Sequence, residues 1–162
     1  MKKIIIVIGQ SASGKTTFVR NNFIGKEYKN IHPTKNIYGC VSGKNFLFGH
    51  YNIGKRCEGT DTMSYSALPY IINYILKIIN EYSNIILEGD RINSKKFFDF
   101  IASLGTVVDV YYFKTSIENS IRRRIEAGSK ASLTFIKTTI TKSENMKQYA
   151  EKLGFNIKEI IT

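Results

Sequence analysis

The sequence predicts a single-domain α/β fold in three layers, with a mostly parallel β-sheet covered by helices on both faces. Short apolar segments rich in β-branched residues alternate along the chain with longer segments whose apolar residues recur at helical spacing. A length of 162 residues suits one hydrophobic core and is short for two. Strands that alternate with helices join through right-handed crossovers, which produces a parallel sheet between two helical layers.

The first half of the chain predicts a strand, a loop, a helix and a hairpin. Residues 3–8 form an unbroken apolar run, as in a strand buried on both faces, and lead into a Gly-rich turn and a helix over 15–22. Segments 36–41 and 45–51 are strand-like, and Ser42-Gly43-Lys44 between them suits a hairpin turn. The pattern is compatible with their joining the main sheet or standing apart from it.

The second half predicts further alternation. A helical stripe covers 66–82, with Pro69 tolerated in the first turn. The elements expected after it are a strand over 84–88, a helix over 94–104 capped by Ser94, a strand over 107–113, helices over 116–127 and 133–153, and a strand over 155–160. Ligands of such sheets bind beyond the carboxyl ends of the strands. Distinctive polar residues fall at those ends, in 9–16, 88–91 and 114–116.

The most specific motif lies at the end of the first predicted strand. Gly-Gln-Ser-Ala-Ser-Gly-Lys-Thr, residues 9–16, matches G-x-x-x-x-G-K-[ST] at every fixed position and stands between a strand and a helix. In such a loop backbone N–H groups surround phosphates, Lys15 neutralises their charge and Thr16 offers a hydroxyl to Mg²⁺. The motif predicts binding of ATP and Mg²⁺. The expected nucleotide-binding residues are Gly9, Ser11, Ala12, Ser13, Gly14, Lys15, Thr16 and Thr17.

With this loop the chain resembles the small P-loop kinases of the nucleoside monophosphate kinase-like group, over essentially its whole length. The resemblance implies a P-loop NTPase fold. Ile86-Leu87-Glu88-Gly89-Asp90-Arg91 is similar to the segment in which these kinases place a strand-terminal acid near Mg²⁺ or the acceptor, followed by an acceptor-binding Arg. By this likeness Glu88 or Asp90 positions the metal or acts as general base, and Arg91 holds the acceptor. The alternative is that Glu88 or Asp90 only caps the following helix.

The same resemblance assigns a lid to about 122–132. Similar kinases carry lid arginines that contact nucleotide base and phosphates, which makes Arg122 and Arg123 candidate nucleotide ligands. No second arginine cluster follows, so the lid is expected to be short or to work differently. Because a helical turn spans about 3.6 residues, Arg122, Arg123 and Arg124 cannot all face one site.

A second concentration of polar and Gly residues occupies 49–64, within a candidate acceptor region of about 31–64. Asp61 is a candidate base for an acceptor hydroxyl. The candidate substrate-binding residues are Tyr51, Lys55, Arg56, Thr60, Asp61 and Arg91. The alternative is a helix-entry loop whose Thr, Asp and Ser side chains cap backbone N–H groups. The Gly-Thr-Asp and Glu-Gly-Asp-Arg segments also resemble phage-type kinases that phosphorylate hydroxymethylated pyrimidines in DNA.

Composition bears on partners and location. The net charge of +11 favours a nucleic-acid partner, although AT-rich coding would also enrich Lys. Cys40 and Cys57 are too few for a disulfide framework and lack the spacing of a zinc site, as in a reduced cytoplasm. The first apolar run reads as a buried strand, and 71–79 is too short to cross a bilayer. We therefore expect a cytoplasmic protein of a bacterial or phage-infected cell, with no membrane segment.

The leading hypothesis is a kinase that moves the γ-phosphoryl of ATP to a hydroxyl on nucleic acid, either a hydroxymethyl base or a polynucleotide end. Lys15 and Mg²⁺ would neutralise charge on the transferred group, and Asp61, Asp90 or Glu88 would orient the attacking hydroxyl. A kinase of free nucleoside monophosphates is the first alternative. A nucleotide-hydrolysing switch ATPase is the second, against which the chain lacks an Asn/Thr-Lys-x-Asp guanine motif.

Overall fold

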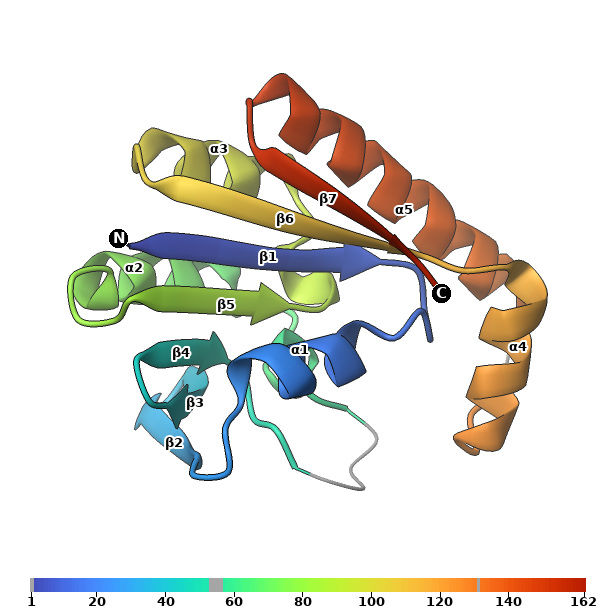
Figure 1. Ribbon diagram of the computed structural model, residues 1–162, viewed down its shortest axis with the longest axis horizontal. Coiled ribbons are helices and arrows are strands. Elements are labelled where there is room, and N and C mark those ends of the chain that lie inside the picture. The colour runs from blue at the N-terminus through green and yellow to red at the C-terminus, as the bar shows by residue number, and fades with distance from the viewer. Residues whose placement is uncertain (1, 53–56, 131) are drawn as a thin grey trace.

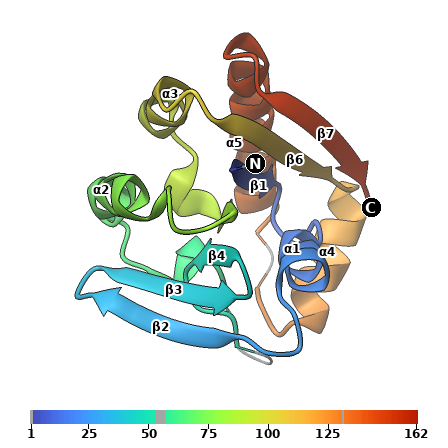
Figure 2. The same ribbon diagram turned by 60° about the vertical axis from the view of Figure 1, so that its left-hand side comes forward.

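Seven strands form one sheet in the computed structural model, which describes residues 2–52, 57–130 and 132–162. The strands are β1 (Lys3–Gly9), β2 (Lys29–Thr34), β3 (Ile37–Ser42), β4 (Asn45–Phe48), β5 (Asn84–Glu88), β6 (Val107–Lys114) and β7 (Asn156–Ile161), in the spatial order β2-β3-β4-β5-β1-β6-β7 (Figure 1). The five strands from β4 to β7 in this order run parallel. Strands β2, β3 and β4 pair antiparallel, so the predicted hairpin joins the main sheet at one edge (Figure 2).

The strand order places a ligand site at the end of β1. After β1 the chain first forms the four strands on one side of it, β2 to β5, and then crosses to the other side for β6 and β7. In a doubly wound sheet, ligands bind at the carboxyl ends of the strands where the order reverses in this way. The loop that follows Gly9 lies at that point.

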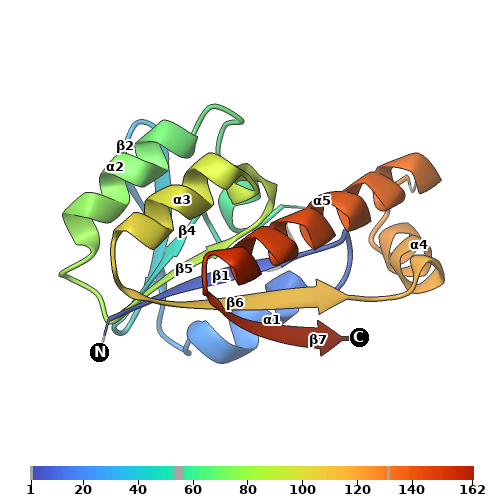
Figure 3. The ribbon, with the colours of Figure 1, turned by 90° about the horizontal axis from the view of Figure 1, so that it is seen from above.

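Helices cover both faces, but unequally (Figure 3). Helices α2 (Leu68–Ile78), α3 (Lys95–Ser103) and α5 (Leu133–Lys152) cover one face, and α1 (Lys15–Phe23) lies on the other. Helix α4 (Ile117–Glu126) lies beyond the carboxyl edge of the sheet (Figure 1). The predicted three-layer fold is therefore confirmed.

The two layers explain why the first strand is apolar throughout. Ile4, Ile6 and Ile8 pack into the larger core beneath α2, α3 and α5, whereas Ile5 and Val7 pack into the smaller core with Val19 of α1. A strand covered on both faces needs apolar residues at odd and even positions alike.

Strand β2 was not predicted, because its sequence, Lys-Asn-Ile-His-Pro-Thr, is mostly polar and contains Pro33. It is an edge strand, where Pro and charged residues are tolerated. The expected strand over 45–51 ends at Phe48, since Gly49 turns with φ of +93°. Two short 3₁₀ helices, Thr60–Thr62 and Asp90–Ile92, were also not predicted.

The helix expected over 66–82 is shorter, Leu68–Ile78. Ser94 caps α3 as predicted, its hydroxyl oxygen accepting a hydrogen bond from the Phe97 amide at 3.2 Å. No helix in the described part of the chain has the length and apolar character needed to cross a membrane.

Candidate functional site

The loop from Gly9 to Thr16 leaves β1 and enters α1 by way of residues with positive φ, +57° at Ala12 and +97° at Gly14. Lys15 lies at the first position of α1, and its ammonium donates hydrogen bonds to the carbonyl oxygens of Gly9 at 3.0 Å and Gln10 at 2.8 Å. Burial lowers the pKa of Lys15, while the carboxylates of Glu88, Asp90 and Asp61 act in the opposite direction. Lys15 therefore lies among carboxylates from two other segments.

The loop fits the phosphates of a nucleotide. A helix N-terminus with a positive-φ glycine before it presents N–H groups to an anion. The Ser13 side chain is fully buried, and its hydroxyl oxygen has no hydrogen-bond partner among the residues that the structure describes. A buried hydroxyl of this kind ordinarily has a partner, which a phosphate oxygen would supply.

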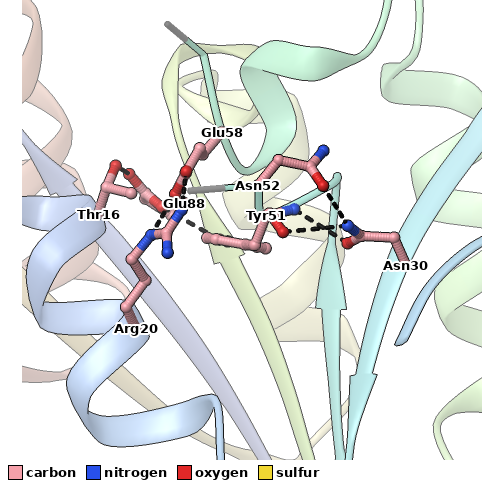
Figure 4. A network of polar contacts seen from close by, with 7 residues as sticks. All are labelled: Thr16, Arg20, Asn30, Tyr51, Asn52, Glu58 and Glu88. Carbon is pink, nitrogen blue, oxygen red and sulfur yellow. Dashed lines mark hydrogen bonds and ion pairs between the residues drawn. The ribbon is translucent and has the colours of Figure 1, made fainter. Parts of the chain in front are cut away.

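Glu88 ends β5 beside the loop because Val7 of β1 pairs with it in parallel register. Its Oε1 accepts a hydrogen bond from the Thr16 hydroxyl, and its Oε2 accepts one from the Tyr51 hydroxyl at 3.1 Å. Burial raises the pKa of Glu88 to about 7, although the Thr16 bond and the Lys15 charge oppose the increase. One buried carboxylate thus joins α1 to the segment after β4 (Figure 4).

Thr16 and Glu88 fit the protein side of a Mg²⁺ site, because Mg²⁺ prefers oxygen ligands and takes few from the protein when phosphates and water supply the rest. Within the described ranges, no group of three or more His, Cys, Asp or Glu side chains is arranged to hold a metal ion. The donor set therefore suits an ion that arrives with a nucleotide. When bound, such an ion would neutralise charge on the phosphates.

Asp61 and Asp90 meet between the two 3₁₀ helices. The Asp61 Oδ1 accepts a hydrogen bond from the Asp90 amide at 3.0 Å and lies 3.5 Å from a guanidinium nitrogen of Arg91. Burial raises the pKa of Asp61, and the nearby charge of Asp90 adds to the increase. The hydrogen bond from the Asp90 amide and the positive charges of Arg91 and Lys15 lower the pKa but do not cancel the increase. Asp61 combines partial exposure with a raised pKa, as a proton acceptor requires.

Arg91 is held in one orientation. Its Nε donates to the Met63 carbonyl at 3.1 Å, and its guanidinium lies 3.6 Å from the ring centroid of Tyr65. The Tyr65 side chain is 88% exposed. The arginine and the tyrosine ring together form a cationic and aromatic surface beside Asp61.

Two glycines allow the acidic segments to approach each other this closely. A Cβ at Gly59 would lie 2.7 Å from the Glu88 carbonyl oxygen, and a Cβ at Gly89 would lie 2.5 Å from the Thr60 hydroxyl. Both residues have positive φ, +65° and +123°. The Thr60 hydroxyl can thus donate to the Glu88 carbonyl at 2.8 Å. Thr60 therefore holds the two segments together rather than facing solvent.

The arginines of α4 divide between the loop and the surface. Arg124 donates to the Ser11 hydroxyl at 2.7 Å and lies over the Phe135 ring, and Arg123 donates to the Ala12 carbonyl at 3.2 Å. Arg122 pairs with Glu126 on the surface, and its side chain is 59% exposed. As expected, the three do not face one site.

The structure brings most of the sequence-predicted residues together. Lys15, Thr16, Tyr51, Thr60, Asp61, Glu88, Asp90 and Arg91 form one connected group around the phosphate loop. Tyr51 is fully buried, with its hydroxyl on Glu88, so its side chain does not face an acceptor here. Thr17 lies exposed in the first turn of α1. Lys55 and Arg56 lie outside the described residues.

Three features of the site were not predicted. Arg124 contacts the loop, Gln10 is buried and bonds the Thr115 backbone and the Ser120 hydroxyl, and Arg20 of α1 pairs with Glu58. A signal for Gln10 exists in hindsight. It is the first residue after a buried strand, where a polar side chain that lies in the interior needs a hydrogen-bond partner.

Neither a family model nor a curated protein matches the chain. Among solved structures, the chain is similar to the tunicamycin resistance protein of Deinococcus radiodurans, at 8% identity and a TM-score of 0.49, over 96% of this chain and 98% of that one. It is also similar to deoxyadenosine kinase from M. mycoides, at 16% identity and a TM-score of 0.44, over 97% and 88%. These similarities are too distant to carry an argument about activity. By its own strand order, phosphate loop and helical layers, the chain is a single-domain α/β protein of the P-loop NTPase fold.

Proposed function

We propose that this chain is an ATP-dependent phosphotransferase that moves the γ-phosphoryl to a hydroxyl on nucleic acid. The observation that carries the proposal is that Glu88 accepts a hydrogen bond from Thr16, next to Lys15, while the Thr60 hydroxyl on the Glu88 carbonyl brings the Asp61–Asp90 pair to the same place. A phosphate-binding cation beside a candidate metal carboxylate and a candidate base supplies the parts that phosphoryl transfer needs.

The donor half of the reaction falls to the phosphate loop. Its backbone N–H groups and Lys15 would hold the β- and γ-phosphates, and Thr16 and Glu88 would hold Mg²⁺. Arg123 and Arg124 already contact the loop and would reach the phosphates or the base of the nucleotide.

Asp61 is our choice of general base for the acceptor hydroxyl. Both carboxyl groups have a raised pKa, but Glu88 is buried with its oxygens on the Thr16 and Tyr51 hydroxyls, whereas the Asp61 side chain is 38% exposed and can be reached by an acceptor. Asp90 accepts a hydrogen bond from Asn93 at 3.1 Å and places its amide on Asp61, which suits support of the base. Arg91 would hold an acceptor phosphate.

The nucleic-acid acceptor is supported by charge. A chain of 162 residues with a net charge of +11 attracts a polyanion more strongly than a single nucleotide, because the attraction grows with the number of phosphates contacted. The exposed ring of Tyr65 beside Arg91 offers a stacking face for a base.

The test is transfer of ³²P from γ-labelled ATP to three acceptors offered separately: hydroxymethyl-base DNA, oligonucleotide ends, and a panel of nucleoside monophosphates. We expect label in one of the two nucleic-acid acceptors. Label found only in free nucleotides would contradict the nucleic-acid acceptor and favour a nucleoside monophosphate kinase. Release of inorganic phosphate without any labelled acceptor would favour the switch ATPase.

Two variants test the roles within the site. Lys15→Ala should reduce transfer by roughly 100-fold or more, because a charge-stabilising donor is lost. Asp61→Asn should reduce transfer by roughly 100-fold while ATP binding stays intact, because only the base is lost. Lys96→Ala, on the exposed surface of α3, is the control. Unchanged turnover in Asp61→Asn would remove Asp61 as the base.

A further inference from the structure

We propose that Tyr51 is a positioning residue that ties the candidate acceptor segment, residues 49–52 and 57–59 of the described chain, to the Mg²⁺·ATP site through Glu88. The inference rests on the proposed function in one respect, namely that Thr16 and Glu88 are the residues that hold the ion. Its starting point is the shared carboxylate, whose one oxygen accepts from Thr16 of α1 and whose other oxygen accepts from Tyr51 (Figure 4).

The position of the Tyr51 hydroxyl is determined by the core. The Tyr51 side chain is fully buried and packs in the smaller core with Val19, Leu47 and Ile86. A ring packed between a helix and two strands cannot swing away from Glu88 without opening that core. The hydroxyl therefore holds the Glu88 carboxylate in a fixed orientation.

The side chain of Asn30, on the edge strand β2, holds the backbone of Tyr51. The Tyr51 amide donates to the Asn30 Oδ1 at 3.0 Å, and the Asn30 Nδ2 donates to the Tyr51 carbonyl at 3.0 Å (Figure 4). The Asn30 Nδ2 also lies 2.9 Å from the Asn52 Oδ1. Asn30 thus positions Tyr51 by its main chain, and within the described ranges its side chain bonds Tyr51 and Asn52 but neither the phosphate loop nor Glu88.

A second link joins the same segment to α1. Arg20 pairs with both carboxylate oxygens of Glu58, with its Nε at 2.6 Å from Oε2. Arg20 follows Thr16 by four residues on α1, so both side chains leave the same face of the helix. The segment therefore contacts this helix face at two points, directly through Glu58 and by way of Glu88 through Tyr51.

These contacts predict that the acceptor segment and the ion influence each other. Loss of the Tyr51 hydroxyl leaves a buried carboxylate with one oxygen unpartnered, and the group is then free to turn from the orientation that the ion requires. Loss of the Asn30 side chain would free the backbone of Tyr51 and so, indirectly, allow the Glu88 carboxylate to turn as well. Because coupling between sites is reciprocal, occupancy of the acceptor segment should in turn change affinity for the ion.

The test compares Tyr51→Phe with wild type in calorimetric titrations with ATP plus Mg²⁺ and with ATP plus EDTA. We expect affinity for Mg²⁺·ATP to fall about tenfold, as for a hydrogen bond to a charged group, and affinity for metal-free ATP to change less than about twofold. Asn30→Ala should lower Mg²⁺·ATP affinity in the same metal-dependent manner. Neither substitution should lower it further in a Glu88→Gln background, since all act through the one carboxylate.

Matched controls separate this role from general loosening. Tyr149→Phe also removes a tyrosine hydroxyl bonded to a carboxylate, that of Asp99, and Asn45→Ala removes an amide that bonds a backbone carbonyl, that of Phe23. Both should leave the two affinities unchanged. Equal losses with and without Mg²⁺ in Tyr51→Phe, or no loss in either titration, would overturn the proposal.

Failure of the proposed function gives a different result. Calorimetry needs no acceptor. If wild-type protein binds Mg²⁺·ATP but transfers phosphate to no acceptor, the proposed kinase activity is contradicted, and the Tyr51→Phe binding comparison remains valid. Wild-type protein for which Mg²⁺ makes no difference to ATP affinity would overturn both.

Discussion

Replacing Glu88 with Gln removes a buried ionisable group from the centre of the site, and we expect the pH dependence of stability to change in a defined way. Burial raises the pKa of Glu88 to about 7 in the folded protein, from an ordinary value of 4.5. Between these two values the folded state keeps a proton that the unfolded chain releases. In the metal-free wild-type protein, the contribution of Glu88 to stability is therefore lost as pH rises from about 4.5 to about 7.

The magnitude follows from the gap between the two values. At about 1.4 kcal/mol for each tenfold change in proton affinity, the gap corresponds to roughly 3 kcal/mol from this one group. Because Gln does not ionise, Glu88→Gln lacks this pH-dependent contribution to the free energy of unfolding. Relative to wild type, its free energy of unfolding should improve by roughly 3 kcal/mol between pH 4.5 and pH 7.5.

Urea unfolding at a series of pH values, without nucleotide or Mg²⁺, measures this difference. Circular dichroism is the main probe and tyrosine fluorescence the second, because the chain has no Trp. Glu126→Gln, which removes an exposed carboxylate, is the control and should follow the wild-type profile. Wild-type and Glu88→Gln profiles that run parallel over the whole pH range would refute the reasoning.

Three further predictions follow from particular contacts. Gly59→Ala should cost about 2 kcal/mol or more of unfolding free energy, against about 1 kcal/mol for Gly105→Ala. The two glycines share a φ near +60°, but a Cβ meets the Glu88 carbonyl at 2.7 Å only at Gly59 and open space at Gly105; equal losses in urea unfolding would contradict this explanation. Asp109→Asn should cost about 2 kcal/mol at neutral pH. Burial alone would raise the pKa of Asp109, but bonds from Lys3 and Asn156 and the Lys158 charge lower it on balance, so the difference from wild type should disappear as unfolding is repeated at falling pH below about 4. Arg124→Ala should weaken ATP binding in calorimetry more than Arg122→Ala does, since Arg124 contacts the loop and Arg122 pairs with Glu126 at the surface; the reverse order would favour Arg122 as the ligand.

The parts of the fold that sequence predicts well are those whose pattern has one physical cause. The unbroken apolar run at 3–8 requires a strand covered on both faces, and the strand-loop-helix order around Lys15 is required by the phosphate loop itself. Strand β2 has no such signal, because its pairing with β3 stabilises it from outside its own sequence.

Within the candidate site, sequence predicted the residues better than their contacts. Glu88 could be placed at a strand end, but its sharing between Thr16 and Tyr51 depends on the register of β1 with β5 and on the course of the chain after β4. The choice among the α4 arginines depends on how that helix is turned. Arg123 and Arg124 follow the buried Ser120 by three and four residues and share its face, while Arg122 does not.

The pairing of β1 has a consequence for the synthesis of the protein. The phosphate loop directly follows β1, but β1 is flanked by β5 and β6, which come much later in the chain, at residues 84 and 107. A growing chain therefore carries this apolar strand without its neighbours until β5 and β6 have been synthesised. Such long-range parallel pairing also folds slowly. The nascent chain should bind ATP only after β6 has emerged, and until then its first strand is a ready target for chaperones.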